Sequence, residues 1–183
     1  KTNVLRKPSI SIWGTNKRVG KTAISVYSAT TLKERGITPV ILSMGRGGPA
    51  EPLKVDQEEI ELTPDYLLKI SEKGFHAASD YWEDAFLSDV PVVGCRRCGG
   101  GMAGNPFISN MKEGAKIAST IPADVFILEG SGPTAPPIKT DKNILIINAG
   151  INPEHSIDFF GEYRVLMADL IILTMCEPPM AGE

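Results

Sequence analysis

The chain has 183 residues, of which 42% are hydrophobic and 22% are charged, and its formal net charge is −3. This composition excludes a disordered or collagen-like chain, and the acidic balance argues against nucleic acid as a partner. The three cysteines form no even disulfide framework and fit a reducing compartment, so we expect a cytoplasmic protein. No apolar run approaches the roughly 20 residues of a membrane span, so we expect no membrane partner.

Short apolar runs alternate with helix-like segments, which is the pattern of a parallel sheet covered by helices. The expected strands are Ser9–Trp13, Pro39–Ser43, Pro91–Val93, Val125–Leu128, Ile144–Ile147 and Leu170–Leu173. The expected helices are Lys21–Arg35, Pro64–Lys73, Asp80–Leu87, Met111–Ile121 and Pro153–Met167. Several strands are apolar on consecutive residues, which is typical of burial on both faces. The sequence therefore predicts an α/β, doubly wound fold with a mostly parallel sheet.

Glycines and cations follow the expected strands, in segments such as Met44–Pro49, Gly94–Gly101 and Glu129–Gly132. In a parallel sheet these loops emerge at one edge, which is where such folds bind ligands. The segments at the opposite edge are plainer turns. The asymmetry places the expected site at the carboxyl ends of the strands.

The segment Thr15–Thr22 after the first strand fits the phosphate-binding loop (P-loop), with threonine where the usual pattern begins with glycine. Backbone N–H groups and the helix N-terminus would hold phosphate oxygens, Lys21 would reach the β- and γ-phosphates, and Thr22 would bind Mg²⁺. The alternative is an ordinary strand–turn–helix. The residues expected to bind nucleotide are Gly14, Thr15, Asn16, Lys17, Arg18, Val19, Gly20, Lys21 and Thr22.

The loop also resembles that of dethiobiotin synthetase-like ATPases, and the segment Ile127–Gly132 resembles their second acidic motif. The resemblance implies that a carboxylate at the strand tip lies near Mg²⁺, so Glu129 is a candidate metal ligand. The alternative for Glu129 is a solvated residue at a strand end. An Asn-Lys-x-Asp base-recognition motif of GTPases is absent from the sequence, which favours ATP over GTP.

Read together, the loops resemble the cyclic 2,3-diphosphoglycerate synthetase family over nearly the whole chain. The resemblance rests on Gly14–Ala23, Ser43–Pro49, His76–Tyr81, Val93–Gly101 and Leu128–Gly132. Proteins of this family are longer, and the chain begins at Lys1, so we expect residues 1–183 to be one P-loop nucleotide-binding domain of a longer protein. The resemblance implies ATP-driven closure of an intramolecular phosphoanhydride in 2,3-diphosphoglycerate, with release of ADP and phosphate.

The cationic side chains of the strand-end loops suit such a compact polyanion, because arginine binds two phosphate oxygens at once. They are Lys17, Arg18, Lys21, Arg46, Arg96 and Arg97. We expect Arg46, His76, Arg96 and Arg97 to bind the substrate, and Lys21, Glu129, Arg96 and Arg97 to act in catalysis. The alternative is that the loop arginines are merely solvated.

Other readings of these motifs stay open at the level of sequence. Asp80 would bind Mg²⁺ or its waters, or it would stabilise a helix N-terminus together with Glu83 and Asp84. Cys95 and Cys98 would belong to a structural anion loop, a zinc site or a redox pair. The alternative functions are another dethiobiotin synthetase-like ligase or kinase, and a P-loop metal chaperone that uses the two cysteines. For the assembly we expect a homo-oligomer.

Overall fold

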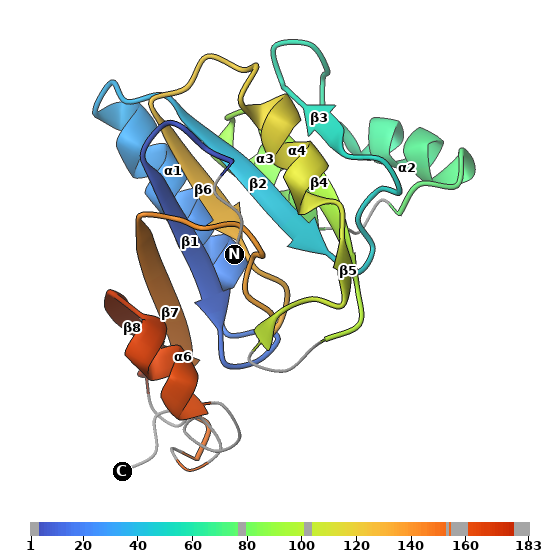
Figure 1. Ribbon diagram of the computed structural model, residues 1–183. Coiled ribbons are helices and arrows are strands. Elements are labelled where there is room, and N and C mark those ends of the chain that lie inside the picture. The colour runs from blue at the N-terminus through green and yellow to red at the C-terminus, as the bar shows by residue number, and fades with distance from the viewer. Residues whose placement is uncertain (1–3, 77–79, 101–103, 153, 155–160, 178–183) are drawn as a thin grey trace.

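The computed structural model describes residues 4–76, 80–100, 104–152, 154 and 161–177 (Figure 1). Its helices there are α1 (Lys21–Glu34), α2 (Pro64–Glu72), α3 (Asp80–Ser88), α4 (Met111–Ala118) and α6 (Gly161–Met167). The strands are β1 (Ser9–Gly14), β2 (Pro39–Gly45), β3 (Leu53–Val55), β4 (Val92–Cys98), β5 (Ile108–Ser109), β6 (Val125–Glu129), β7 (Lys142–Asn148) and β8 (Leu170–Thr174). None of the helices in the described residues is long and apolar enough to cross a membrane.

The strands form one sheet in the order β3-β4-β2-β6-β1-β7-β8. Neighbours from β4 to β8 run parallel, whereas β3 and β5 pair with β4 in the antiparallel sense. The predicted doubly wound, mostly parallel α/β fold is therefore confirmed. The two antiparallel strands were missed because β3 has three residues and β5 has two, too few to produce an apolar run.

The third expected strand was placed too short, and the correction bears on the site. It was expected to end at Val93 and to be followed by a loop, but β4 continues to Cys98. The parallel register with β2 carries on through Arg96, and β5 then pairs with Arg97 and Cys98. Arg96 and Arg97 are thus strand residues whose side chains point to opposite faces of the sheet.

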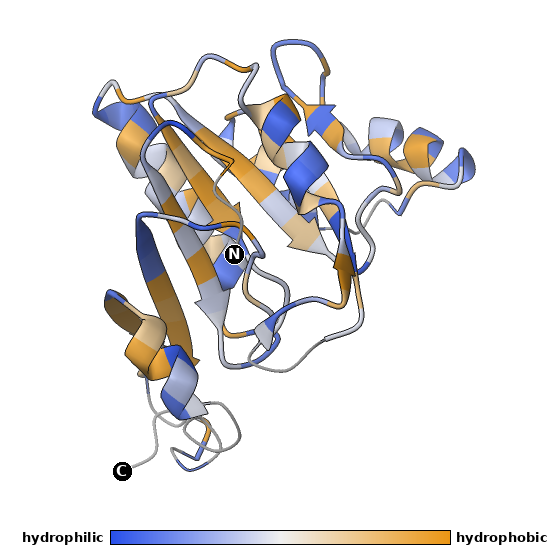
Figure 2. Cartoon of the chain, in the orientation of Figure 1, coloured by the Kyte–Doolittle hydropathy of each residue, from blue (hydrophilic) through white to orange (hydrophobic). Residues whose placement is uncertain are grey.

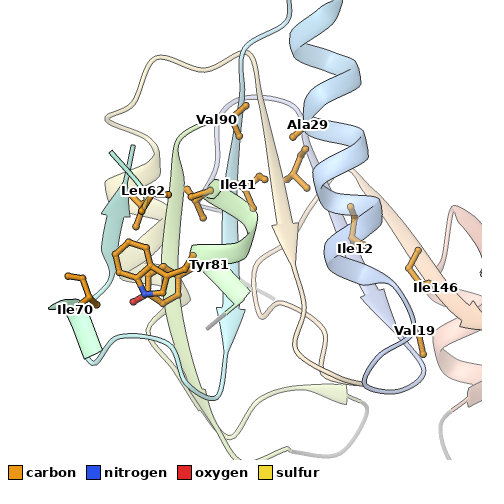
Figure 3. Packing of buried hydrophobic residues seen from close by; sticks show 14 residues of the cluster. Ile12, Val19, Ala29, Ile41, Leu62, Ile70, Tyr81, Val90 and Ile146 are labelled. Atoms are coloured by element: carbon orange, nitrogen blue, oxygen red, sulfur yellow. The ribbon is translucent and has the colours of Figure 1, made fainter. Parts of the chain in front are cut away.

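Helices cover both faces of the sheet because strand residues alternate between two apolar cores. Ile41 of β2 packs with residues of α1 and α3 such as Ala29 and Tyr81, as Figure 3 shows. The neighbouring Leu42 packs in the second core with residues of α4 such as Met111. Figure 2 shows the hydrophobic residues concentrated along the central strands.

The start and stop signals of α2 are confirmed. The Thr63 hydroxyl accepts a hydrogen bond of 3.2 Å from the backbone N–H of Tyr66, Pro64 is the first helical residue, and Gly74 follows with φ of 84°. At the last expected helix, Asn152 Oδ1 accepts a 3.0 Å hydrogen bond from the backbone of Glu154. Pro153 and residues 155–160 of that helix lie outside the described residues, and its end is α6.

Candidate active site

The P-loop connects β1 to α1 by a tight turn that excludes side chains at particular positions. A Cβ atom on Gly14 would lie 2.4 Å from Cγ2 of Val19, and Gly20 has φ of 92°. Arg18 also has positive φ, 58°. Because α1 begins at Lys21, the N-terminus of this helix faces the end of the loop, as a phosphate site requires.

Lys21 lies within this loop rather than in solvent. Its side chain is buried, and its Nζ donates a hydrogen bond of 3.2 Å to the backbone carbonyl of Asn16. Burial lowers the pKa of Lys21, while the nearby carboxylates of Glu129 and Asp80 oppose that shift. The ammonium group is therefore held at the loop, where phosphate oxygens would replace the single carbonyl.

Glu129 ends β6 beside the first turn of α1. The Thr22 hydroxyl donates a hydrogen bond of 2.8 Å to its Oε1, whereas Oε2 is buried without a hydrogen-bond partner among the described residues. Burial raises the pKa of Glu129 to about 7. A buried carboxylate beside a P-loop threonine fits a site for Mg²⁺, which prefers oxygen ligands.

Asp84 is a functional candidate that the sequence reasoning assigned only to the helix N-terminus. Its side chain is fully buried, and neither of its oxygens has a hydrogen-bond partner in the described part of the chain. Burial, and then the neighbouring Glu129, raise the pKa of Asp84 well above its usual range, which favours the protonated form of this carboxyl group. The sequence signal that could have identified Asp84 was its spacing from Asp80, since residues four apart share one face of a helix.

A cavity of about 630 Å³ opens at the carboxyl ends of the strands and brings most of the expected site residues together. Its lining comprises Lys17, Arg18, Gly20, Lys21, Thr22, Ala23, Gly45, Arg46, Gly47, His76, Asp80, Glu83, Glu129, Ser131, Gly132 and Met175. The P-loop thus faces Arg46 of the loop after β2, His76, and Asp80 at the start of α3. Asp80 reaches close to the end of β2, since a Cβ on Gly45 would lie 3.7 Å from its Oδ2.

Arg96 and Arg97 are not in the cavity lining and bind backbone carbonyls instead. Arg96 Nε donates a hydrogen bond of 2.5 Å to Gly48. Arg97 is 1% exposed, and its Nη1 and Nη2 donate to Gly99 at 2.6 Å and to Ser131 at 3.0 Å. Burial lowers the pKa of Arg97, and the nearby Arg46 lowers it further. Direct contact of these two arginines with a substrate stays a prediction.

The carboxylates that the structure describes at this site are not grouped into a cage for a metal ion. Within the described ranges, no group of three or more His, Cys, Asp and Glu side chains is placed to hold a metal. Mg²⁺ is commonly bound by one or two carboxylates together with substrate phosphates and waters. Thr22, Glu129 and Asp80 fit that arrangement.

The strand geometry bears on the alternatives for the two cysteines. Cys95 is buried and Cys98 is exposed, on opposite faces of β4. Three residues of extended strand span roughly 10 Å, which exceeds the Cα separation of a disulfide and the reach of a shared zinc ion. Burial also raises the pKa of the Cys95 thiol to about 12. The strand geometry therefore does not favour a redox pair, a shared zinc site or a chaperone that uses both cysteines.

A second hollow, of about 670 Å³, lies at the amino ends of β2 and β4. Its cations are already paired: Lys33 with Asp89 at 2.6 Å, and Lys54 with Asp56 and Glu59 at 3.1 and 2.7 Å. By contrast, Lys17, Arg18 and Arg46 form no ion pair with the described residues. Of these two cavities, the one at the carboxyl edge is lined by cations that form no ion pair with the described residues, so it is the better anion site of the two.

The chain shares its fold with a solved structure at low sequence identity. LpxK from Aquifex aeolicus, solved as the "apo" form in complex with ATP, superposes with a TM-score of 0.62 at 20% identity. The match covers 100% of this chain and 53% of LpxK. At this identity the likeness shows the fold alone.

Sequence comparison gives a closer relation. The model of the family described as "Cyclic 2,3-diphosphoglycerate synthetase, P-loop domain" matches residues 9–183. The chain is 52% identical to the cyclic 2,3-diphosphoglycerate synthetase of Methanothermobacter thermautotrophicus over 99% of its length, and 54% identical to that of Thermococcus kodakarensis over 94%. It spans only 39% and 40% of these relatives. The chain belongs to the cyclic 2,3-diphosphoglycerate synthetase family, of which it contains the P-loop domain.

Proposed function

We propose that the protein containing this domain closes the intramolecular phosphoanhydride of 2,3-diphosphoglycerate at the expense of ATP, with release of ADP and phosphate. The observation that carries the proposal is the cavity at the carboxyl edge, where the P-loop faces unpaired cations. The names of the relatives support this reaction over a ligase or kinase of the dethiobiotin synthetase type.

ATP would lie with its phosphates on the P-loop. Lys21 would exchange its bond to the Asn16 carbonyl for bonds to the β- and γ-phosphates. Thr22, Glu129 and Asp80 would hold Mg²⁺, which supplies neutralisation of phosphate charge when bound. A bound cation would favour the ionised form of Glu129, because a cation and a proton compete for the same carboxylate oxygens.

The substrate would lie between the P-loop and the loop after β2. Arg46 and His76 line that side of the cavity, and both are exposed to an entering ligand. Arginine binds two phosphate oxygens at once, and a ring nitrogen of histidine can donate a hydrogen bond to another. These groups would hold the two substrate phosphates close together and so favour ring closure over reaction with water.

We propose two transfers. An oxygen of one substrate phosphate attacks the γ-phosphorus of ATP and expels ADP. An oxygen of the other substrate phosphate then attacks the phosphorus of the first and expels inorganic phosphate, which keeps the bridging oxygen. Lys21 and the neighbouring cations stabilise the charge that collects in both steps.

Phosphorus NMR tests the proposed reaction directly. The full-length protein, mixed with ATP, Mg²⁺ and 2,3-diphosphoglycerate, should produce a new cyclic phosphoanhydride with one ADP and one phosphate for each ring. ATP consumption without a cyclic product would reject the proposed function. Oxygen-18 in the substrate phosphates should appear in the released phosphate, and its absence there would exclude the two-step route. The homo-oligomer stays a prediction, which light scattering on the full-length protein would test.

A further inference from the structure

We infer that Arg96 and Arg97 are positioning residues, each of which fastens one glycine-rich loop of the cavity. The inference rests on the proposed function, and it is the alternative to the direct phosphate contacts expected from the sequence. The two loops are residues 46–50 after β2 and residues 130–134 after β6. Arg96 contacts the first and Arg97 the second, and both loops supply residues to the cavity.

Arg96 holds the first loop at the point where the loop packs directly against the backbone of β4. Its Nε donates a hydrogen bond of 2.5 Å to the carbonyl of Gly48. A Cβ atom on Gly48 would lie 2.0 Å from the carbonyl oxygen of Cys95, so only glycine permits this contact between loop and strand. The loop is therefore packed directly on the backbone of β4.

Asn110 completes this attachment from the start of α4. Its Oδ1 accepts a hydrogen bond of 2.6 Å from the backbone N–H of Arg96, and its Nδ2 donates to the carbonyls of Pro49 and Ala50 at 3.1 and 2.9 Å. Arg96 and Asn110 therefore bind three consecutive carbonyls of the loop, those of residues 48, 49 and 50. Because Arg46 lies only two residues before the first of them, this attachment determines where its guanidinium stands in the cavity.

Arg97 holds the second loop from the opposite face of β4. Its guanidinium lies beneath the turn at Ser131 and Gly132, since a Cβ on Gly132 would lie 3.7 Å from Nη2. It donates to the carbonyls of Ser131 and Gly99, and it is almost fully buried. The turn that it supports follows Glu129 directly and lines the cavity. To reach a ligand, Arg97 would have to leave two carbonyls unpaired, which is costly for a buried group.

Glycine-rich loops need anchors of this kind. Their glycines let the backbone approach phosphate closely, but they provide no side chains to fix the loop and leave it more conformational freedom. The rigid, forked guanidinium of arginine suits the task, because it presents several donors in one plane. Adjacent strand positions reach both faces of the sheet, so the pair Arg96 and Arg97 serves both loops.

Two substitutions of Arg96 separate anchoring from direct phosphate binding. The amide nitrogen of glutamine and the Nε of arginine are the same number of bonds away from Cα. Arg96→Gln therefore keeps a hydrogen-bond donor for the Gly48 carbonyl but loses the positive charge. Arg96→Lys keeps the charge but moves the donor one atom further along the side chain.

The anchoring role predicts that, in the full-length protein, Arg96→Gln keeps the KM for 2,3-diphosphoglycerate within about threefold of wild type. Arg96→Lys should raise it by about tenfold or more, the effect of losing a charge-assisted hydrogen bond. The KM for ATP should change little in either variant. The reverse order, with Lys active and Gln impaired, would overturn the inference and support direct binding. Arg35→Gln and Arg35→Lys, at the exposed end of α1, are matched controls.

Hydrogen exchange of the full-length protein tests the anchor without relying on activity. Asn110→Asp keeps the acceptor for Arg96 and loses both donors to the loop. This variant and Arg96→Lys should speed exchange of the amides at 45–50, while wild-type exchange persists in the P-loop and in α4. Unchanged exchange at 45–50 in both variants would overturn the inference. If exchange responds as expected but the wild type forms no cyclic product, the anchor holds and the proposed function fails.

Discussion

The hydroxyl of Thr22 donates a hydrogen bond of 2.8 Å to Oε1 of Glu129, and so joins the first turn of α1 to the last residue of β6. This bond keeps the two proposed metal ligands side by side. The geometry of the P-loop and that of the acidic strand end are thus coupled.

Glu129→Gln should leave the protein folded and nearly inactive. The amide oxygen of Gln can still accept the hydrogen bond from Thr22, but it supplies no charge to a metal ion. Metal coordination contributes several kcal/mol of transition-state stabilisation, so kcat should fall by about 10²-fold or more. Steady-state phosphate release by the full-length protein measures the effect. Thr22→Ser keeps the hydroxyl and should stay close to wild type; full activity of Glu129→Gln would remove Glu129 from the metal site.

Lys21→Met should separate nucleotide binding from stability. The ammonium group is buried and its pKa is lowered by that burial, so its loss removes a desolvated charge from the fold. ATP affinity, measured by calorimetry, should fall by roughly 10- to 100-fold, because charge-assisted hydrogen bonds to phosphate are lost. The melting temperature should hold or rise. A variant that binds ATP as tightly as wild type would contradict the proposed role of Lys21.

The stability of the nucleotide-free protein should decrease as the pH rises from about 4.5 to above 7. Burial raises the pKa of Glu129 from 4.5 to about 7, so in this range the folded state binds more protons than the unfolded state. The proton that stabilises the folded state is fully bound below the pKa that Glu129 has in the unfolded protein. It is lost as the pH rises past the pKa that Glu129 has in the folded protein. Asp84, with its raised pKa, acts in the same direction.

Urea unfolding at pH 5 and pH 8 checks this dependence. Glu129→Gln and Asp84→Asn should each flatten it, because each removes one member of the carboxyl pair. If the free energy of unfolding of both variants depends on pH as steeply as that of the wild type, other groups bind the stabilising proton.

A thiol reagent should distinguish the cysteines in the native protein. Cys98 and Cys176 are exposed, whereas Cys95 is buried and has a pKa raised to about 12. Ellman's reagent should therefore modify Cys98 and Cys176 within minutes and Cys95 only after denaturation. Rapid native labelling of Cys95, identified by mass spectrometry, would show that its packing against α4 is loose.

Gly114→Ala should destabilise the protein although alanine favours helices. A Cβ at position 114 would lie 2.3 Å from Sγ of Cys95, and relieving such overlap costs about 1–3 kcal/mol. The more favourable helix propensity of alanine offsets at most about 1 kcal/mol of this cost. Adding Cys95→Ala removes the clashing atom, so the double variant should be more stable than the two single effects predict. Additive free energies of unfolding would show that the two side chains do not compete for space.

The sequence predicted the fold well because its signals are local. Six apolar runs became the parallel strands, and the P-loop followed from the spacing of Gly14, Gly20 and Lys21 between a strand and a helix. Thr63 and Pro64 likewise determined the start of α2 without help from tertiary structure.

The site was predicted less completely because its remaining features depend on pairing and burial. The extension of β4 to Cys98 needs β2 and β5 as partners, so Arg96 and Arg97 could not be recognised as strand residues from their own segment. The burial of Asp84 depends on α3 lying over β2 and β4, and nothing near it in the chain indicates a carboxyl partner at Glu129.

The alternation of side chains at the end of β4 limits how this segment can vary. Cys95 and Arg97 point to the face covered by α4, and Arg96 and Cys98 point to the other. Single substitutions affect one loop at a time. An insertion or deletion of one residue here would exchange all four side chains between the faces and detach both loops at once. Variation in length is therefore confined to the connections around β4, and its last four residues must keep their number even where their identity changes.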